Sequence, residues 1–185
     1  MPKSDLKSAR IVVPALTAAL VLMAPVIMST GAYAIEPTRT TKDRGLQFTD
    51  VSLTVNKQTN DQGFVTSASL SSTFEVTGAG TGGKATLTST ALVTQGCINK
   101  GGNDPEGLKR TRETTTGSIT FEAHQGRGGG TVTTNAITSP SAGFTCPSEK
   151  NMTPVLVGVE FTNIKLTVTT DEGKSITATF ANQDP

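Results

Sequence analysis

The stretch Val155-Leu-Val-Gly-Val-Glu-Phe-Thr-Asn-Ile-Lys-Leu-Thr-Val168 decides the fold class of this chain. Apolar side chains first occupy the odd positions, up to Phe161, and this alternation predicts a strand with one buried face. From Ile164 onward the apolar positions are even. Because a strand cannot exchange its two faces without an extra residue, we expect a bulge or a turn at Thr162-Asn163.

The same alternation recurs along the chain at intervals of about ten residues. Asp171-Glu-Gly173 is typical of a tight hairpin turn. Glycine-rich turns are expected at Gly78–Gly83 and Gly126–Gly130, and two longer loops at 95–109 and 139–151. The other strands are marked by alternating runs at 51–55, 68–76, 85–93, 119–123, 132–136 and 176–180.

This pattern predicts an all-β protein of about eight strands with no convincing helix. Threonine is abundant after residue 34, and its branched Cβ favours strands. The spacing fits an antiparallel two-sheet sandwich, immunoglobulin-like in outline. The chain has no Trp and places its cysteines outside the strand runs, so we do not expect a true antibody domain, whose disulfide crosses the core.

The two cysteines, Cys97 and Cys146, fall in the two longest loops. In an exported protein they are expected to form one disulfide, and two free thiols are the alternative. The bond would close a loop of about 50 residues, for which chain entropy gives about 4 kcal/mol. We expect it to clamp the two loops together at one end of the sandwich.

The first 34 residues have the pattern of an export signal. Basic residues precede an apolar run over 11–28, and Gly31-Ala-Tyr-Ala34 places small residues where a signal peptidase cleaves. An uncleaved membrane anchor is the alternative, since the run is just long enough to span a bilayer. We expect cleavage after Ala34, a secreted or cell-envelope protein, and no membrane contact after cleavage.

The remainder has the length of one domain. We expect a flexible lead over 35–45 and a single β domain over 46–185. Lys109, Arg110 and Arg112 form a basic cluster, but acidic residues flank it and no aromatic side chain is near. Nucleic-acid binding surfaces combine a basic face with aromatic residues, so we read the cluster as a solvated loop and expect no nucleic-acid partner.

No residue is assigned a catalytic role. His124 is the one histidine, and it is out of phase with the apolar positions of its strand, so it should face solvent. Neither a triad nor a zinc site can be built around a single histidine without a matching nucleophile or thiolates. Gly78-Ala-Gly-Thr-Gly-Gly83 resembles a dinucleotide-binding loop, but a strand pattern follows it where that loop requires a helix.

The candidate binding residues lie in the two cysteine loops. They are the polar side chains Asn99, Asn103, Asp104, Glu106 and Glu149. The side-chain oxygens of Asn99, Asn103, Asp104 and Glu106 make a weak calcium site an alternative, although the spacing differs from an EF-hand. We expect no other cofactor and assign no metal ligands. A pair of these carboxylates could also hydrolyse a glycosidic bond, but exported glycosidases usually have aromatic sugar platforms, which are missing here.

Two further patterns concern the surface. Asn151-Met-Thr153 has the form of a glycosylation sequon, and its use depends on the organism. Outward-facing threonines at alternate positions, such as 86, 88 and 90, could bind ice or a crystalline polysaccharide if the array is flat. Ordinary strand-surface threonine is the simpler interpretation.

The chain resembles a family of small exported prokaryotic proteins of unknown function, common in soil actinobacteria. The resemblance covers roughly 48–180 and depends most on Cys97-Ile-Asn-Lys-Gly-Gly-Asn103 together with the later Cys146-Pro147. This sequence departs from the family pattern after Asn103, where charged residues replace an uncharged stretch. The resemblance implies export and a β-sandwich-like domain, and it implies no site residues.

We therefore expect a non-enzymatic secreted or envelope module that binds or adheres through its disulfide-clamped loops, since rigid strands that carry long loops are a common arrangement for binding. The partner would be a cell-wall or extracellular glycan or a protein. An extracellular polysaccharide hydrolase that uses the loop carboxylates is one alternative. A secreted effector or inhibitor of another protein is a second.

Overall fold

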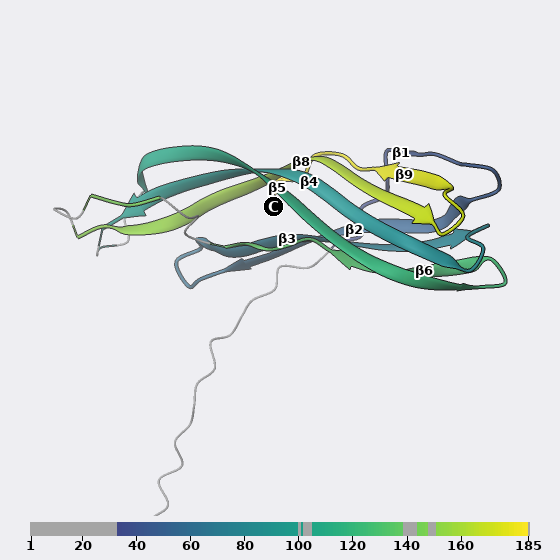
Figure 1. Ribbon diagram of the computed structural model, residues 1–185. Coiled ribbons are helices and arrows are strands. Elements are labelled where there is room, and N and C mark those ends of the chain that lie inside the picture. The colour runs from purple at the N-terminus through teal and green to yellow at the C-terminus, as the bar shows by residue number, and fades with distance from the viewer. Residues whose placement is uncertain (1–32, 100, 102–104, 139–143, 148–150, 185) are drawn as a thin grey trace, which may run out of the picture.

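The computed structural model describes residues 33–99, 101, 105–138, 144–147 and 151–184. Most of the expected export signal, residues 1–32, lies outside these ranges. The described residues form nine strands and no helix, which confirms the all-β prediction (Figure 1). The strands are β1 (Arg39–Thr40), β2 (Gln47–Thr59), β3 (Val65–Thr77), β4 (Gly82–Ile98), β5 (Glu106–His124), β6 (Arg127–Thr133), β7 (Ile137–Thr138), β8 (Thr153–Thr170) and β9 (Ser175–Thr179).

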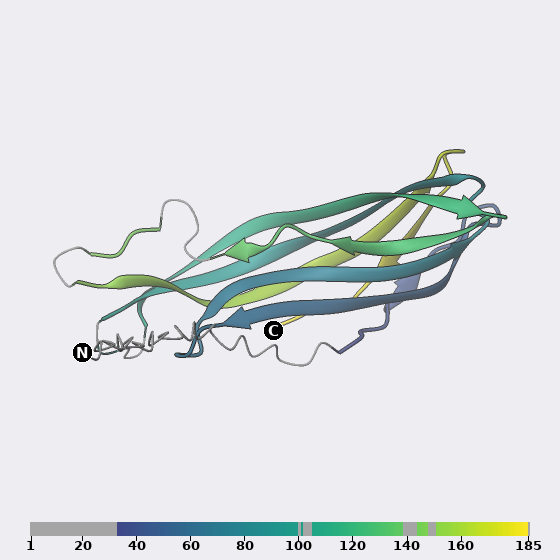
Figure 2. The same ribbon diagram turned by 90° about the horizontal axis from the view of Figure 1, so that it is seen from below.

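The expectation of a two-sheet sandwich is wrong, because all nine strands belong to one sheet. The order is β1-β9-β8-β4-β5-β6-β3-β2, and β3 also pairs with β8 through Val65 and Leu156. This pairing closes β3, β4, β5, β6 and β8 into a five-stranded barrel. In Figure 1 the middle parts of β4, β5 and β8 lie above β3, and Figure 2 shows the long strands from below.

Strand length and bulges explain why the sheet closes. β4, β5 and β8 have 17, 19 and 18 residues, so their right-handed twist carries the sheet far around its own axis. Bulges add local bending to these strands. Alternation in the sequence shows that each strand buries one face, but a sandwich and a barrel have the same alternation.

The bulge expected at Thr162-Asn163 in β8 is confirmed. Thr162 pairs with Thr90 and Lys165 with Thr88, so two residues of β8 lie opposite one of β4. Asn163 has a positive φ of 53°, a conformation that asparagine tolerates better than most residues. Ile164 is thereby turned into the core, where it is fully buried.

A second irregularity in β8 was not expected. Gly158 pairs with Thr94 but Leu156 pairs with Gln95, so Val157 is an extra residue in this part of the ladder. Leu156 is buried instead of Val157, which is only partly buried. The simple odd-position alternation is therefore wrong at Val157, because a bulge shifts the register by one residue.

Two predicted connections are shorter than expected. The loop predicted over 95–109 is largely strand, since β4 continues to Ile98 and β5 begins at Glu106. The turn predicted at Gly126–Gly130 is confined to Gln125-Gly126, and Gly128 to Gly130 belong to β6. A Cβ on Gly128 or Gly130 would collide with Phe121 or Ile119, so these glycines allow β5 and β6 to pack closely.

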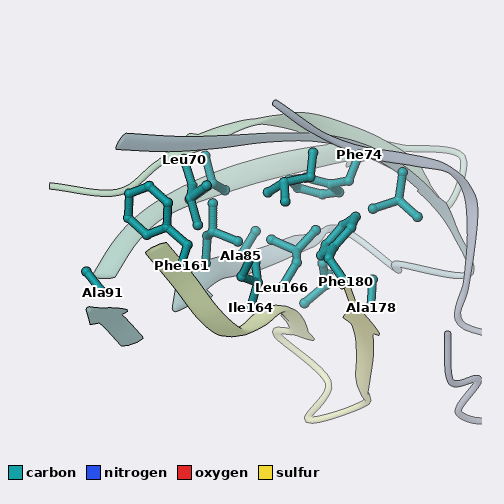
Figure 3. Packing of buried hydrophobic residues seen from close by; sticks show 14 of the residues in the cluster. Leu70, Phe74, Ala85, Ala91, Phe161, Ile164, Leu166, Ala178 and Phe180 are labelled. Atoms are coloured by element: carbon teal, nitrogen blue, oxygen red, sulfur yellow. The ribbon is translucent and has the colours of Figure 1, made fainter. Parts of the chain in front are cut away.

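The core is one apolar cluster along the barrel (Figure 3). Phe74 and Phe161 are its largest fully buried side chains. The Phe74 and Phe121 rings meet edge to face at 5.4 Å between centroids, a favourable aromatic geometry. Burial of this cluster supplies the main favourable term in folding.

We call one end of the barrel the turn end, because four turns meet there: 43–46, 78–81, 125–126 and 171–174. Gly78 and Gly80 have positive φ angles, and a Cβ on Gly78 would collide with the backbone of Gly45. The Gly78–Gly83 segment is thus a turn that leads into a strand, as expected.

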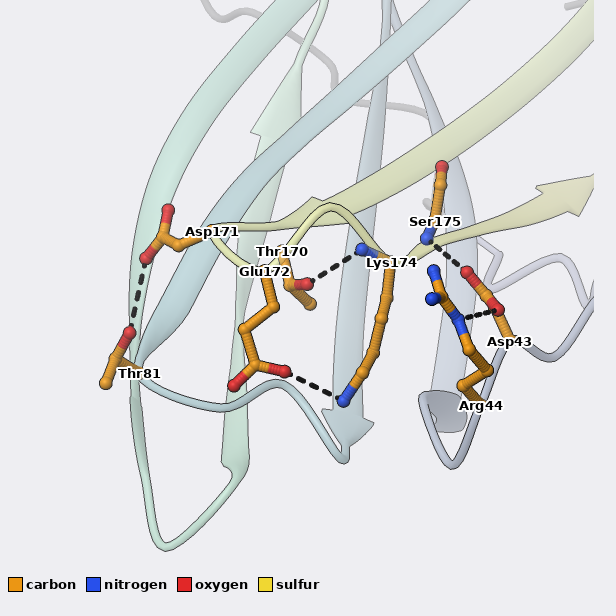
Figure 4. Close-up of polar contacts among 8 residues, drawn as sticks. All are labelled: Asp43, Arg44, Thr81, Thr170, Asp171, Glu172, Lys174 and Ser175. Atoms are coloured by element: carbon orange, nitrogen blue, oxygen red, sulfur yellow. Dashed lines mark hydrogen bonds and ion pairs between the residues drawn. The ribbon is translucent and has the colours of Figure 1, made fainter.

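Polar contacts join these turns (Figure 4). The backbone N–H of Ser175 donates to Asp43 Oδ2 at 3.0 Å, and with the bond from Arg44 it holds the pKa of Asp43 below its usual value. The Lys174 ammonium lies 2.9 Å from Glu172 Oε2 and lowers the pKa of that carboxyl. The bond from Ser175 to Asp43 therefore links the 43–46 turn to the start of β9, whereas the Lys174–Glu172 pair lies within the 171–174 turn.

The segment expected as a lead makes backbone hydrogen bonds to the sheet. Ile35 and Leu53 exchange two bonds, at 2.8 and 2.9 Å. Further along, β1 pairs with β9, and the Thr38 N–H donates to the Thr179 carbonyl. The residues just after the predicted cleavage site therefore add to the edges of the sheet.

Candidate functional site

The disulfide lies at the opposite end of the barrel, which we call the clamped end. Cys97 and Cys146 are bonded, with their Cα atoms 5.8 Å apart, so the expected bond is confirmed. Its position differs from the expectation, because Cys97 is a residue of β4 and pairs with Glu106 and Pro154. The bond therefore ties segment 144–147 directly to the sheet.

Two of the candidate site residues can be placed. Glu106 begins β5 beside Cys97 and is exposed, and it makes a polar contact of its own. Asn99 is exposed just after β4, and its side-chain oxygen accepts a 2.9 Å bond from the N–H of Gly101. Asn103, Asp104 and Glu149 lie outside the described residues.

A pocket of about 360 Å³ adjoins the disulfide. Glu106 and Gly107 form one wall, at the start of β5. Phe144, Pro147 and Met152 are the apolar side chains of the lining, and Glu106 is the one acidic residue among its described members. Among the described residues its lining is Cys97, Glu106, Gly107, Phe144, Thr145, Pro147 and Met152.

The sequence analysis missed Phe144 and Met152, since it selected only polar loop residues. Both flank Cys146 within a few positions, so proximity to a disulfide-bonded cysteine is the signal that could have found them. Neither belongs to an alternating run, and the disulfide joins segment 144–147 to β4. Apolar residues near a disulfide-bonded cysteine are therefore candidates for a binding site.

A larger hollow, of about 580 Å³, lies over β3 and β6. Its floor includes Gly129, where a Cβ would collide with the backbone of β3. The rim carries Glu75, Arg127 and threonine hydroxyls. The Thr73 and Thr131 hydroxyls bond each other across the two strands at 3.0 Å. We therefore attribute this hollow to the close pairing of β3 with the glycines of β6.

The described residues offer few groups for catalysis. His124 is exposed at the end of β5, as expected, and thus lies at the turn end, away from Glu106. Within the described ranges no three residues of the His, Cys, Asp and Glu types come together as a metal site would need. Of the four residues proposed for calcium, Asn99 and Glu106 are described, whereas Asn103 and Asp104 are outside those ranges.

In the part of the chain that the structure covers, no helix has the length and apolar character needed to cross a bilayer. The disulfide between Cys97 and Cys146 is compatible with an extracellular protein.

Comparisons with known family profiles, with curated proteins and with solved structures each give no match for this chain.

Proposed function

We propose that this protein is a non-enzymatic, exported binding module, and that its ligand is an extracellular or cell-wall macromolecule held at the clamped end. The observation that carries the proposal is the pocket beside the disulfide, which Phe144, Pro147 and Met152 line together with Glu106. Binding sites commonly combine an apolar lining with a few polar groups that orient the ligand.

The disulfide gives this site a physical basis. Phe144 and Pro147 come from a segment whose link to the sheet is the bond between Cys146 and Cys97. Holding a loop in its bound conformation before the ligand arrives reduces the entropy lost on binding. A rigid barrel that presents a clamped loop fits a binding role. Export is the second part of the proposal, because an exported protein meets the oxidising environment in which disulfides persist.

Co-sedimentation with purified cell walls and a panel of insoluble polysaccharides tests this proposal. We expect the oxidised protein to pellet with one of these materials and the reduced protein to remain in solution. Phe144→Ala combined with Met152→Ala should abolish pelleting. The matched control, Thr73→Ala combined with Thr131→Ala, changes the larger hollow over β3 and β6 and should pellet like the unmodified chain.

Pelleting that survives both reduction and the pocket substitutions would contradict a role for the clamped end. If no material pellets the protein, cross-linking in the native extracellular fraction should recover a protein partner, and recovery should depend on Phe144. If the protein neither pellets with any material nor cross-links to a protein partner, the proposal is wrong.

A further inference from the structure

β5 has one side without a partner strand over part of its length. Along its other side it pairs with β4 throughout. On the free side, β6 pairs only with Ala123 and His124, and the Thr116 carbonyl accepts a bond from the N–H of Asn135 at 3.2 Å. Between Leu108 and Thr115 no described residue pairs with β5 on this side.

The reason lies in the path of the chain after β6. Its continuation, β7, pairs with β3 through Ile137 and Ala68. β5 continues past this point toward the disulfide (Figure 2), so its ladder with β4 extends beyond the last bond from Asn135. An exposed strand edge of this kind is a template for another strand.

Antiparallel geometry identifies the backbone groups that are free. In such a ladder successive residues direct their N–H and C=O groups to opposite sides. The Thr116 carbonyl points to the free side, and the register with β4 is regular from Thr116 to Arg110. Thr114, Arg112 and Arg110 therefore also direct their N–H and C=O groups to the free side, whereas the residues between them direct theirs toward β4.

The side chains give this edge a positive charge. Arg110 and Arg112 share one face of β5 about 7 Å apart, and both are exposed. Among the described residues neither guanidinium has a carboxylate partner. Lys109 adds a third cation, and Glu113 is the one acidic residue between 107 and 116.

The positive charge of this edge favours an acidic partner strand over a second copy of the same edge. A second copy that paired through the same edge would bring arginines close to arginines, and like charges across a strand pair are destabilising. A strand with carboxylates at alternate positions would instead place them beside Arg110 and Arg112. Arginine binds carboxylates through two parallel hydrogen bonds.

We propose that the edge of β5 from Arg110 to Thr114 binds an acidic, extended segment of a partner protein, which adds to the sheet as a further strand. Main-chain hydrogen bonds supply affinity in this mode, and side chains supply selectivity. The surface is distinct from the pocket beside the disulfide, and its test does not depend on that pocket.

The test uses a labelled peptide of about seven residues in which threonine and glutamate alternate. Fluorescence anisotropy should show saturable binding to the oxidised full chain. Amide hydrogen exchange should slow at Arg110, Arg112 and Thr114 when the peptide binds. The amides of Thr111 and Glu113 should not change, because they already face β4 in the ladder.

Paired charge reversals separate this edge from general attraction to positive charge. Arg110→Glu with Arg112→Glu should weaken binding at least about tenfold. The control, Lys84→Glu with Lys165→Glu, makes the same change in net charge on exposed positions of β4 and β8 and should leave affinity nearly unchanged. Phe144→Ala should also retain peptide binding.

Equal loss in both double variants would overturn the proposal, as would binding without slower exchange at the three amides. Absence of binding by the unmodified chain at millimolar peptide would overturn it as well. So would sedimentation that shows self-association through this edge, since the free strand would then serve a second copy. A peptide with lysine in place of glutamate should not bind.

Discussion

The two ends of the barrel are stabilised in different ways. At the turn end, short turns pack backbone against backbone, and the neighbouring interior is apolar, with Leu166 and Ile176 almost fully buried. Toward the clamped end the interior contains buried polar side chains, among them Ser89 and Gln95, and a disulfide joins the segment after β7 to the sheet. A covalent bond thus holds the end toward which Gln95 is buried.

The two ends also differ in how many groups they leave available for binding another molecule. The turn end has few free backbone groups, since its turns bond one another. The clamped end has a free strand edge, an apolar pocket and, at Thr111, a buried hydroxyl without a hydrogen-bond partner among the described residues. Binding residues are often found on loops held by a rigid scaffold, and a buried unsatisfied polar group in a native structure calls for an explanation.

The largest expected effect is the loss of a core side chain near the turn end. Leu166→Ala should lower the free energy of unfolding by about 3 to 5 kcal/mol, because it leaves a cavity in a closely packed interior. Denaturant unfolding of the oxidised protein measures this change. Leu108→Ala, at the clamped end where Leu108 is 61% exposed, should change the value by less than about 0.5 kcal/mol; similar losses for both would remove the contrast.

Removal of the disulfide should have the next largest effect. Cys97→Ser with Cys146→Ser should destabilise the chain by about 2 to 4 kcal/mol, because the unfolded state regains the freedom of a long loop. Thermal unfolding of this variant and of the reduced parent should agree. An unchanged midpoint in both would show that the bond does not stabilise the clamped end.

The polar interior predicts a smaller, non-additive effect. Ser89 and Thr115 hydroxyls are buried and lie 2.7 Å apart. Ser89→Ala should cost about 1 to 3 kcal/mol, since it leaves the Thr115 hydroxyl buried without this partner. Adding Thr115→Val should recover part of that loss, which a double-mutant cycle measures. Additive losses would mean that the two hydroxyls act independently.

The smallest expected effect is a pH dependence at the turn end. The bonds from Ser175 and Arg44 lower the pKa of Asp43 in the folded state. This contribution is fully present above the ordinary carboxyl pKa and is lost as the pH falls through the lowered pKa. Asp43→Asn should therefore lower the Tm slightly at neutral pH, and the difference from the parent should disappear in acid. A constant difference would contradict this assignment.

Much of the strand pattern was predictable, because burial on one face imposes a period of two on the sequence. The bulge at Asn163 was predictable for the same reason, since the apolar positions change parity there. The bulge at Val157 was not, because Val155, Val157 and Val159 all fit one face and any of them satisfies the pattern. Only the pairing of Leu156 with Gln95 shows which residue is extra.

The candidate site was predictable in part. The cysteines and Glu106 indicated one end of the molecule, and the structure places Glu106 beside Cys97. Phe144 and Met152 were not predictable from periodicity, since they lie outside the strands. The disulfide joins the segment of Phe144 to β4, and Met152 immediately precedes β8. The free edge of β5 was not predictable either, because the segment that contains Arg110 and Arg112 was interpreted as a solvated loop.

By itself the sequence determined the all-β class, the approximate strands, the disulfide partners and the main turns, since these depend on alternation, glycine conformation and the count of two cysteines. The tertiary structure decided that the sheet closes into a barrel, that β7 pairs with β3, and that the pocket forms beside Cys97. These features depend on which strands pair, and pairing is set by twist, bulges and long-range packing that no local pattern encodes.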